Sequence, residues 1–476
     1  MQADAEHRRR VGHRGHPRAA RRHRAGIART LGRGRRGEPA VNEWQRVHPA
    51  SPFVHGWLAI VGLAWVYWQN TDDISWAERF TGSRLAWTVG IGSAALALVL
   101  IFYALSWYFT RYRISETHVY VNAGMVFRSQ KQARIDRVQG IDIAQPLVAR
   151  LLGLAELRFD VADGSASVMR LSFLRKAHAH QLRAEILALA QGEIPVQEEA
   201  AQPVPLMAKV PAGRLLASMF LRLPTVVGVL LALVLGILSL SGVGVLVAGL
   251  VPMLLGFGGW FYKELNNSWN FSASATDTGL RISHGLADTK QQSLPAGRVQ
   301  SIQISSPAFW RLLGWYRVEV NALGVGEEEM SNLLVLPVGD FEAVTQVMGI
   351  LLPELGVENQ RAVLHTAITS GTDHGFTSSP ARAKALSPGA WKHQAFLSTG
   401  SCVITRFGWL SRSAAFVPHR RIQGMVLQQG PWERRRELAG IRLYSAGGSI
   451  MGYMHQLDEQ VATEFFAAQA RRQVER

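Results

Sequence analysis

The sequence predicts a multi-domain membrane protein in which two transmembrane α-helical hairpins are combined with three α+β modules. Two observations carry this prediction. One spacing pattern of glycine, arginine, glutamine and proline occurs three times, and four long apolar stretches occur in two close pairs. A recurring pattern indicates one supersecondary unit used several times. An uncharged stretch of about 20 residues is long enough to cross a bilayer.

The repeated pattern begins with a glycine that precedes an Arg-Val-Gln or Arg-Ile-Gln triplet by 13 residues. A proline follows the glutamine after 7, 7 and 8 residues, and a further glycine follows each proline. The first glycines are Gly124, Gly285 and Gly408, and the last are Gly153, Gly314 and Gly440. The repeated signature residues are Arg137, Gln139, Arg298, Gln300, Arg421 and Gln423.

Each copy is embedded in about 80 residues of short alternating strands followed by one helix. Turn residues separate the strands, and a glycine such as Gly124 is expected to adopt a positive φ. Helical spacing closes each copy, with Asp340 and Asp458 expected to cap the closing helices of the second and third copies. We therefore predict a curved antiparallel sheet whose open end is covered by a C-terminal helix.

The four apolar stretches are predicted to be membrane spans. They are Phe53–Gln69, Leu85–Phe109, Leu223–Leu240 and Val243–Tyr262. Aromatic residues gather near their ends, where the headgroup interface favours them. No Asp, Glu, Lys or Arg lies in the middle of a span, which disfavours a transporter or channel. Two buried hairpins of a soluble protein are the alternative.

Loop charges predict the orientation of the spans. The loop Asn70–Arg84 is net acidic, and the second turn, at Ser241-Gly242, is uncharged. Arginines flank the spans on the other side, and Arg222 is expected to snorkel to the interface. Both turns then face outward, and the modules and both termini face the cytoplasm of a cell with this protein in its inner membrane.

The predicted segments follow from these patterns. They are a disordered Arg/His-rich arm (1–43), a first hairpin (53–109), a first module (110–191), a linker (192–213), a second hairpin (222–262), a second module (268–356), a polar linker (357–392) that leaves the next module free to swing, and a third module (393–474).

Charge is concentrated in the arm. The net charge is +16, and residues 1–37 hold 12 arginines against two acids. The arm has the composition of an anion- or lipid-contacting segment, its four histidines raise metal binding, and a solvated tail or translated upstream sequence is the simpler interpretation. The rest is mildly basic, so no nucleic-acid partner is expected. The single cysteine, Cys402, excludes an internal disulfide and is expected to be a small buried residue.

The signature segments Arg137 to Ile141, Arg298 to Ile302 and Arg421 to Met425, with the two-span hairpins, resemble YdbT-type bacterial membrane proteins. Those proteins carry bacterial pleckstrin-homology-like domains. The resemblance covers about residues 44–475. It implies a seven-strand sheet with a C-terminal helix in each module, a multi-pass membrane location and no catalytic activity.

Two groups of residues are candidates for ligand contact. The signature Arg and Gln residues fit either an anion site or a structural role in which they bond backbone carbonyls, and the structural role is favoured. In the third module, a basic set is the candidate anion- or lipid-contacting group, with an ordinary charged rim as the alternative. This set comprises Arg420, Arg421, Arg434, Arg435 and Arg436.

No catalytic motif, metal-ligand cluster or cofactor-binding loop is found, so we expect neither an enzyme nor a cofactor. The expected function is a membrane-proximal scaffold or interaction platform. Its expected partners are the lipid bilayer, anionic headgroups, and a partner membrane protein or a second copy of the chain. The alternative is a component of a membrane transport or envelope-stress system that acts with a partner membrane protein.

Overall fold

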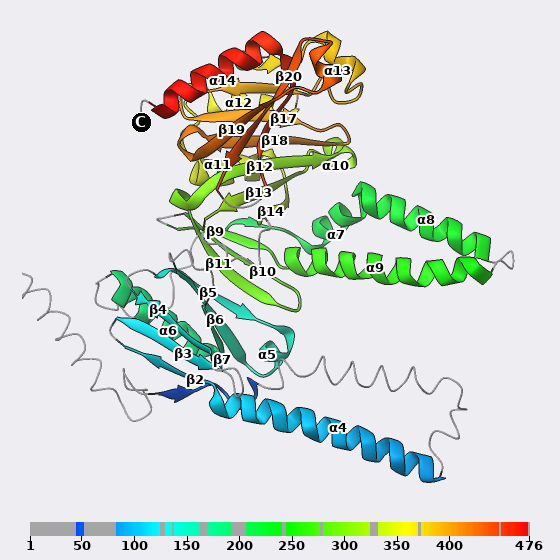
Figure 1. The fold of residues 1–476 in the computed structure, drawn as a ribbon, viewed down its shortest axis with the longest axis vertical. Coiled ribbons are helices and arrows are strands. Elements are labelled where there is room, and N and C mark those ends of the chain that lie inside the picture. Colours follow the sequence, from blue (N-terminus) through cyan, green and yellow to red (C-terminus); the bar gives the residue numbers. More distant parts are fainter. Residues whose placement is uncertain are drawn as a thin grey trace, which may run out of the picture. The chain divides into compact units, whose positions relative to one another are not determined.

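The computed structural model describes most of the chain after residue 43, so the predicted arm lies outside the described residues. The described ranges are 44–51, 82–115, 117–123, 129–135, 138–161, 169–191, 206–239, 244–276, 279–323, 332–369, 373–446 and 449–474. They form two compact units. The first contains β1 to β4, α4, β6, β7 and α6, and the second contains β5, α5 and all elements after residue 200 (Figure 1).

The described strands fall into three sets of seven, one set per module. The first set is β1 (Gln45–Arg46), β2 (Arg111–Ile114), β3 (His118–Ala123), β4 (Ser129–Arg134), β5 (Val138–Gln145), β6 (Leu154–Val161) and β7 (Met169–Arg175). The second is β8 (Leu206–Lys209), β9 (Ser272–Thr276), β10 (Gly279–His284), β11 (Thr289–Pro295), β12 (Val299–Pro307), β13 (Tyr316–Ala322) and β14 (Leu333–Gly339). The third is β15 (Thr377–Ser378), β16 (Ala395–Ser398), β17 (Cys402–Phe407), β18 (Ser411–Pro418), β19 (Ile422–Gln428), β20 (Leu438–Ser445) and β21 (Gly452–Asp458).

The long apolar helices are inserted inside the modules, between the first and second strands. In the first module α4 (Gly82–Phe109) leads into β2, and in the second α7 (Ala212–Phe220), α8 (Leu223–Ser239) and α9 (Gly244–Ser268) lie between β8 and β9. The predicted module starts at 110, 268 and 393 therefore omit one strand each. The pairing of β1 with β2, of β8 with β9 and of β15 with β16 closes each insertion.

A helix follows the seventh strand of each module, as predicted. These helices are α6 (Lys176–Gln191), α11 (Phe341–Leu351) and α14 (Glu459–Val474). The Asp340 side chain accepts a hydrogen bond from Ala343 N at 3.0 Å and caps α11, and Asp458 accepts one from Gln460 N at 3.1 Å at the start of α14. The apolar face of α11 is buried in the core of its module through Val344 and Val347. Both predicted caps are confirmed.

A short helix follows the fifth strand of each module. These helices are α5 (Leu147–Leu151), α10 (Ala308–Leu312) and α13 (Pro431–Arg434). In the first unit, β1 to β4 form one antiparallel sheet and β6 pairs with β7, against which α6 packs through Leu182 and Ile186.

In the second unit, neighbouring modules are joined strand to strand. β5 pairs antiparallel with β11, and β12 pairs antiparallel with β18. The second joint is the longer one, with six residue pairs from Ile302 opposite Phe416 to Pro307 opposite Ser411. The sheet that contains it runs β14-β13-β12-β18-β17-β16-β15, so it is built from the last strands of one module and the first strands of the next.

The predicted polar linker 357–392 is wrong for this reason. It contains α12 (Gln360–Thr369), β15 and a 3₁₀ turn at Ala381–Ala385. Val363, Leu364 and Ala367 of α12 are buried in the core of the second module. Because the backbone hydrogen bonds of β12 and β18 hold the third module, it does not swing on a flexible tether.

The glycines of the repeat occupy turns that require a positive φ. Gly285 has φ 131° and Gly408 has φ 94°, and a Cβ on either would lie within about 2 Å of a backbone oxygen, so the predicted turn is confirmed at both. Gly124 lies outside the described residues. Gly153 and Gly314 also have positive φ, at 67° and 62°.

Gly440 is not the third member of that last set. It lies inside β20, where Gly440 pairs with Gln428. The strand register shows that the position of Gly314 in the third module belongs to Glu437, which has φ 51°. A residue with a Cβ therefore adopts a left-handed conformation at this turn, which costs about 1–2 kcal/mol.

We predict that Glu437→Gly raises the stability of the chain by about 1 kcal/mol, since glycine removes the left-handed strain and loses little else. The Glu437 side chain is 77% exposed and its nearest cation, Arg382, lies 3.9 Å away. Urea unfolding in detergent would measure the change.

The matched control is Gly314→Ala. A Cβ there meets nothing within 4 Å, so the only effect is backbone strain, and stability should fall by about 1 kcal/mol. A loss of stability in Glu437→Gly would contradict the assignment of this turn.

Candidate membrane anchor and lipid-facing rim

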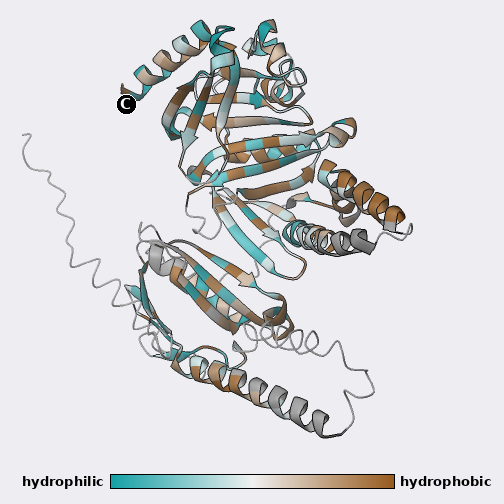
Figure 2. Ribbon diagram, turned by 45° about the vertical axis from the view of Figure 1, so that its right-hand side comes forward, coloured by the Kyte–Doolittle hydropathy of each residue, from teal (hydrophilic) through white to brown (hydrophobic). Residues whose placement is uncertain are grey.

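Helix α8 exposes apolar side chains on all sides. Its residues are brown along its length in Figure 2, and the exposed ones range from 36% to 59% accessible. A helix that is apolar all round is typical of a core or of a bilayer, and α8 is not buried in a core. The exposed residues are Leu223, Val227, Val229, Leu230, Leu231, Leu233, Val234, Ile237 and Leu238.

Helices α8 and α9 lie side by side, and the ring of Phe257 on α9 packs against Gly228 on α8 (Figure 1). A Cβ on Gly228 would lie 2.9 Å from that ring, so the glycine allows the close approach. In the first unit, α4 likewise exposes Leu98, Ile101 and Phe102 by 55% to 69%.

Of the described helices, none taken singly meets the length and hydropathy expected of a membrane span, whereas residues 212–220 and 223–238 meet it together across a 63° bend. The predicted first span, Phe53–Gln69, lies outside the described residues.

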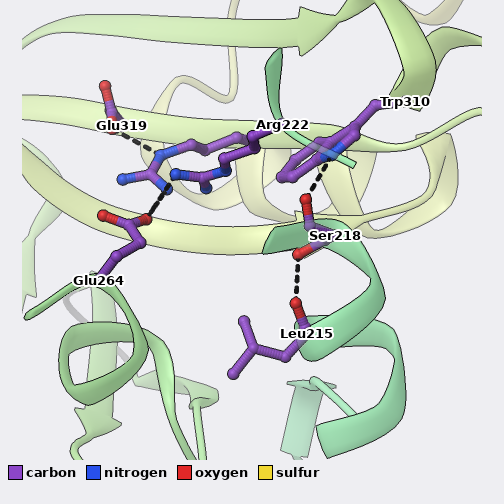
Figure 3. A network of polar contacts seen from close by, with 7 residues as sticks. Leu215, Ser218, Arg222, Glu264, Trp310 and Glu319 are labelled. Atoms are coloured by element: carbon purple, nitrogen blue, oxygen red, sulfur yellow. Dashed lines mark hydrogen bonds and ion pairs between the residues drawn. The ribbon is translucent and has the colours of Figure 1, made fainter. Parts of the chain in front are cut away.

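A network of charged side chains holds the base of the α8–α9 pair to the second module (Figure 3). Oε1 of Glu264 on α9 accepts from Arg222 at 2.8 Å and from Arg317 on β13 at 2.5 Å. Arg317 also donates its Nε to Glu319 at 2.6 Å. The four side chains are only 15% to 21% exposed, so the pairing is poorly screened by water.

The network has a mixed electrostatic balance. Burial raises the pKa of the Glu264 carboxyl, but the charges of Arg317 and Arg222 outweigh it and lower that pKa below its ordinary value. Burial alone would lower the pKa of Arg317, and the attraction of Glu264 and Glu319 raises it instead. All members are therefore charged at neutral pH, and loss of one leaves the others uncompensated.

Trp310 of α10 completes the base. Its indole Nε1 donates to the backbone oxygen of Ser218 at 2.8 Å, and the Ser218 hydroxyl donates to the backbone oxygen of Leu215 at 2.7 Å (Figure 3). The guanidinium of Arg222 lies 5.2 Å from the Trp310 ring centroid. Arg222 was expected to snorkel outward, and the structure corrects this: it is directed into the ion-pair network.

The short helices after the fifth strands expose large apolar or basic side chains. Leu151 on α5 is 79% exposed and Leu312 on α10 is 84% exposed. The same repeat position in the third module is Arg435, beside Trp432, which is 64% exposed. In Figure 1, α5, α10 and α13 lie toward the side of the second unit from which α8 and α9 project. We call the exposed ends of these three helices the rim.

The predicted basic set is divided between two places. Arg434, Arg435 and Arg436 are exposed in or directly after α13, on the rim. Arg420 and Arg421 belong to the 3₁₀ turn His419–Arg421 at the other end of β19. The seven residues of β19 separate the two groups by about 20 Å, so they do not form one site.

Arg421 has a contact of its own. Its guanidinium donates to the backbone oxygen of Gly297 in the preceding module, across the β12–β18 joint. Gln300 is buried, and its Nε2 donates to the backbone oxygen of Arg298 at 3.0 Å. Both contacts are of the kind that the structural interpretation of the signature expects. Gln423 is exposed, whereas Arg137 and the side chain of Gln139 lie outside the described residues.

The Arg222–Glu264–Arg317 network could not be assembled from the sequence alone, since its members come from three distant segments. The available signal was Glu264 itself, an acid two residues after the end of a predicted span. Cys402 is fully buried, as predicted, and burial raises the pKa of its thiol. No group of three metal-ligating side chains occurs in the part of the chain that the structure describes.

Comparison with known proteins agrees with the three-module fold. The family described as "Bacterial PH domain" matches residues 54–190, 218–349 and 378–473. These matches cover well over half of the chain, so the chain belongs to the bacterial PH domain family. A search of curated proteins finds no match. The predicted pleckstrin-homology-like modules are thereby confirmed, and the class they define is a lipid- or protein-interaction scaffold.

We predict that Glu264→Gln destabilises the chain by about 2–4 kcal/mol at pH 7, because removal of one partner leaves two half-buried arginines without their carboxylate. Thermal unfolding in detergent would measure it. The matched control is Glu342→Gln, since Glu342 pairs with Arg361 at an exposed site and such pairs contribute about 0–1 kcal/mol.

The pH dependence gives a second check. Because the folded-state pKa of Glu264 is lowered, its contribution is present above its unfolded pKa of about 4.3 and is lost as the pH falls through the folded value. The difference between wild type and Glu264→Gln should therefore shrink in acid. A constant difference across that range would indicate a packing defect instead.

Proposed function

We propose that this chain is a multi-pass, YdbT-type membrane protein whose cytoplasmic PH modules form a non-enzymatic scaffold at the inner face of the membrane. The observation that carries the proposal is the exposed apolar surface of α8. Nine large side chains are left between one third and two thirds exposed on a single helix. In water such a surface costs on the order of 10 kcal/mol, and a bilayer removes that cost.

The dimensions of the helices support this proposal. At 1.5 Å per residue, α9 is about 37 Å long and α4 about 42 Å long, against a hydrocarbon core of about 30 Å. Trp260 and Tyr262 lie near the end of α9 that leads to the module, where the headgroup interface favours aromatic side chains.

The scaffold role is supported by the joints between modules. A module inserted in the membrane through α8 and α9 is tied to its hairpin by the Glu264 network and to the next module by the β12–β18 pairing. Such a chain presents its modules as a fixed row instead of as beads on a flexible string.

Site-directed labelling in intact bacterial cells tests the topology. In a Cys402→Ser background, Ser241→Cys at the predicted outward turn should react with a membrane-impermeant maleimide in intact cells. Glu464→Cys on α14, an exposed site, should react only after permeabilisation. The chain should also remain with the membrane after a carbonate wash. Recovery in the soluble fraction, or labelling of Glu464→Cys from outside, would refute the proposal.

A second candidate function is contact of the third module with anionic headgroups. Trp432 and the exposed arginines of the rim place an interfacial aromatic ring beside a cationic cluster, and Arg435 lies 5.4 Å from the Trp432 ring. Each arginine near an anionic leaflet adds about 1 kcal/mol of attraction.

For this candidate we predict that an environment-sensitive dye on Trp432→Cys shifts to the blue when the full chain is placed in anionic nanodiscs, and that added salt reverses the shift. Neutral nanodiscs should give no shift. The triple change of Arg434, Arg435 and Arg436 to Gln should abolish it, whereas Arg420→Gln should not, because Arg420 lies at the other end of β19. An equal shift in neutral discs would rule out a headgroup contact.

A further inference from the structure

Two open strand edges remain in the part of the chain that the structure describes. β19 is the terminal strand of the sheet β19-β20-β21, and β4 is the terminal strand of the sheet β1-β2-β3-β4. By position in the repeat, β19 is the counterpart of β5 and β12, and β4 is the counterpart of β11 and β18. Those counterparts pair with each other inside the chain, as β5 with β11 and β12 with β18.

The two internal joints have the same register. Lys290 pairs with Ala144 in the first, and Ser413 pairs with Ser305 in the second. The signature arginines fix the repeat offsets at 161 and 123 residues, and these offsets superpose one pair on the other. The joint is therefore a repeated feature of the fold with a defined alignment. The same offsets place Leu427 opposite Gln130 and Val426 opposite Lys131 in a third joint of this type.

The exposure of β19 indicates that its cover is missing. Leu427 is 40% exposed, whereas its counterparts Ile304 and Ile143 are 1% and 3% exposed. Val426 on the opposite face of the strand is also 40% exposed. An edge strand with apolar side chains and unpaired backbone groups is a template for strand addition.

The composition of β4 selects the occupant. Ser129 to Gln132 are exposed, and the strand SQKQAR carries two positive charges and no acid. Two β4 strands would bring like charges together, which disfavours pairing of β4 with itself. β19 has no charged residue, so it accepts β4 without repulsion.

We propose that β19 of one copy of this chain pairs antiparallel with β4 of a second copy, and so repeats between chains the joint that links the modules within one chain. This contact is heterologous, so successive copies close into a ring or extend as a row. Arg434 then takes the place of Arg150, whose Nη1 donates to the backbone oxygen of Leu286 in the next module at 3.0 Å.

Disulfide cross-linking between two tagged copies tests the proposal in native membranes. One copy carries Gln130→Cys and the other Leu427→Cys, while the fully buried Cys402 stays in place. Directly opposite residues bring their Cβ atoms to about 5 Å, so oxidation should link the two tags in one product. Lys131→Cys with Val426→Cys should do the same from the other face.

The matched control is Gln130→Cys with Gln428→Cys, since a shift of one residue directs the side chain to the opposite face of the strand. We expect about tenfold less product from this pair, because its thiols cannot approach the required geometry. Repetition in detergent separates this contact from the membrane proposal: chains that never reach the bilayer still cross-link if the strands pair.

A charge exchange gives a second test that does not depend on cysteine reactivity. Val426→Lys opposes Lys131 and should suppress the Gln130–Leu427 cross-link, whereas Val426→Glu should retain it. Lys131→Glu should restore the cross-link to Val426→Lys. These exposed substitutions leave the cores of both modules intact.

Three outcomes would overturn the proposal. The first is no product from either opposite pair although maleimide modifies all four thiols. The second is a product only when both cysteines lie on one chain, which would show that a chain closes on itself. The third is protection of Leu427→Cys from maleimide without any product between copies, which would assign the edge to a different protein.

Discussion

The backbone pairing between β12 and β18 is the interaction on which the rest of the second unit depends. A sheet of three or four strands leaves polar edges that must be paired, covered or solvated. Here the last strands of one module and the first strands of the next complete a single seven-stranded sheet. The boundary between repeats in the sequence is therefore not the boundary between sheets, and a module cut out at its sequence limits would lose a paired edge.

The insertion of the apolar helices between the first two strands of a module has a mechanical consequence. Both ends of the α7–α9 segment are fixed to adjacent strands, because Lys209 on β8 pairs with Ser272 on β9. The Glu264 network then fixes the pair of helices to β13. A hairpin attached only at one end, as the sequence interpretation had it, would transmit no orientation to its module. The inserted hairpin does transmit orientation, which suits a scaffold that must present its edges at a set angle to a bilayer.

The sequence was sufficient for features that depend on local patterns, and not for those that depend on distant pairing. Alternation and helical spacing predicted the strands and the closing helices, and Asp340 showed where α11 begins. The first strands were missed because Gln45–Arg46 is two residues long and lies more than 60 residues before its partner Arg111. The segment 357–392 was interpreted as a linker because its polar residues conceal the buried face of α12. Glu437 was overlooked because a glycine three residues later seemed to complete the pattern.

The rim shows how the third module differs from the other two. At one repeat position the modules carry Leu151, Leu312 and Arg435, and at the next the change from Leu313 to Arg436 repeats this difference. The residues between β15 and β16 of the third module form a short 3₁₀ turn where the second module has α7, α8 and α9. A module without a hairpin has no permanent anchor, and an apolar tip in its place would expose leucines to water whenever the module left the surface. Arginine tolerates both environments, and its attraction to an anionic leaflet is reversible and screened by salt. The replacement of leucine by arginine is thus the change expected where a fixed hydrophobic contact gives way to an electrostatic one.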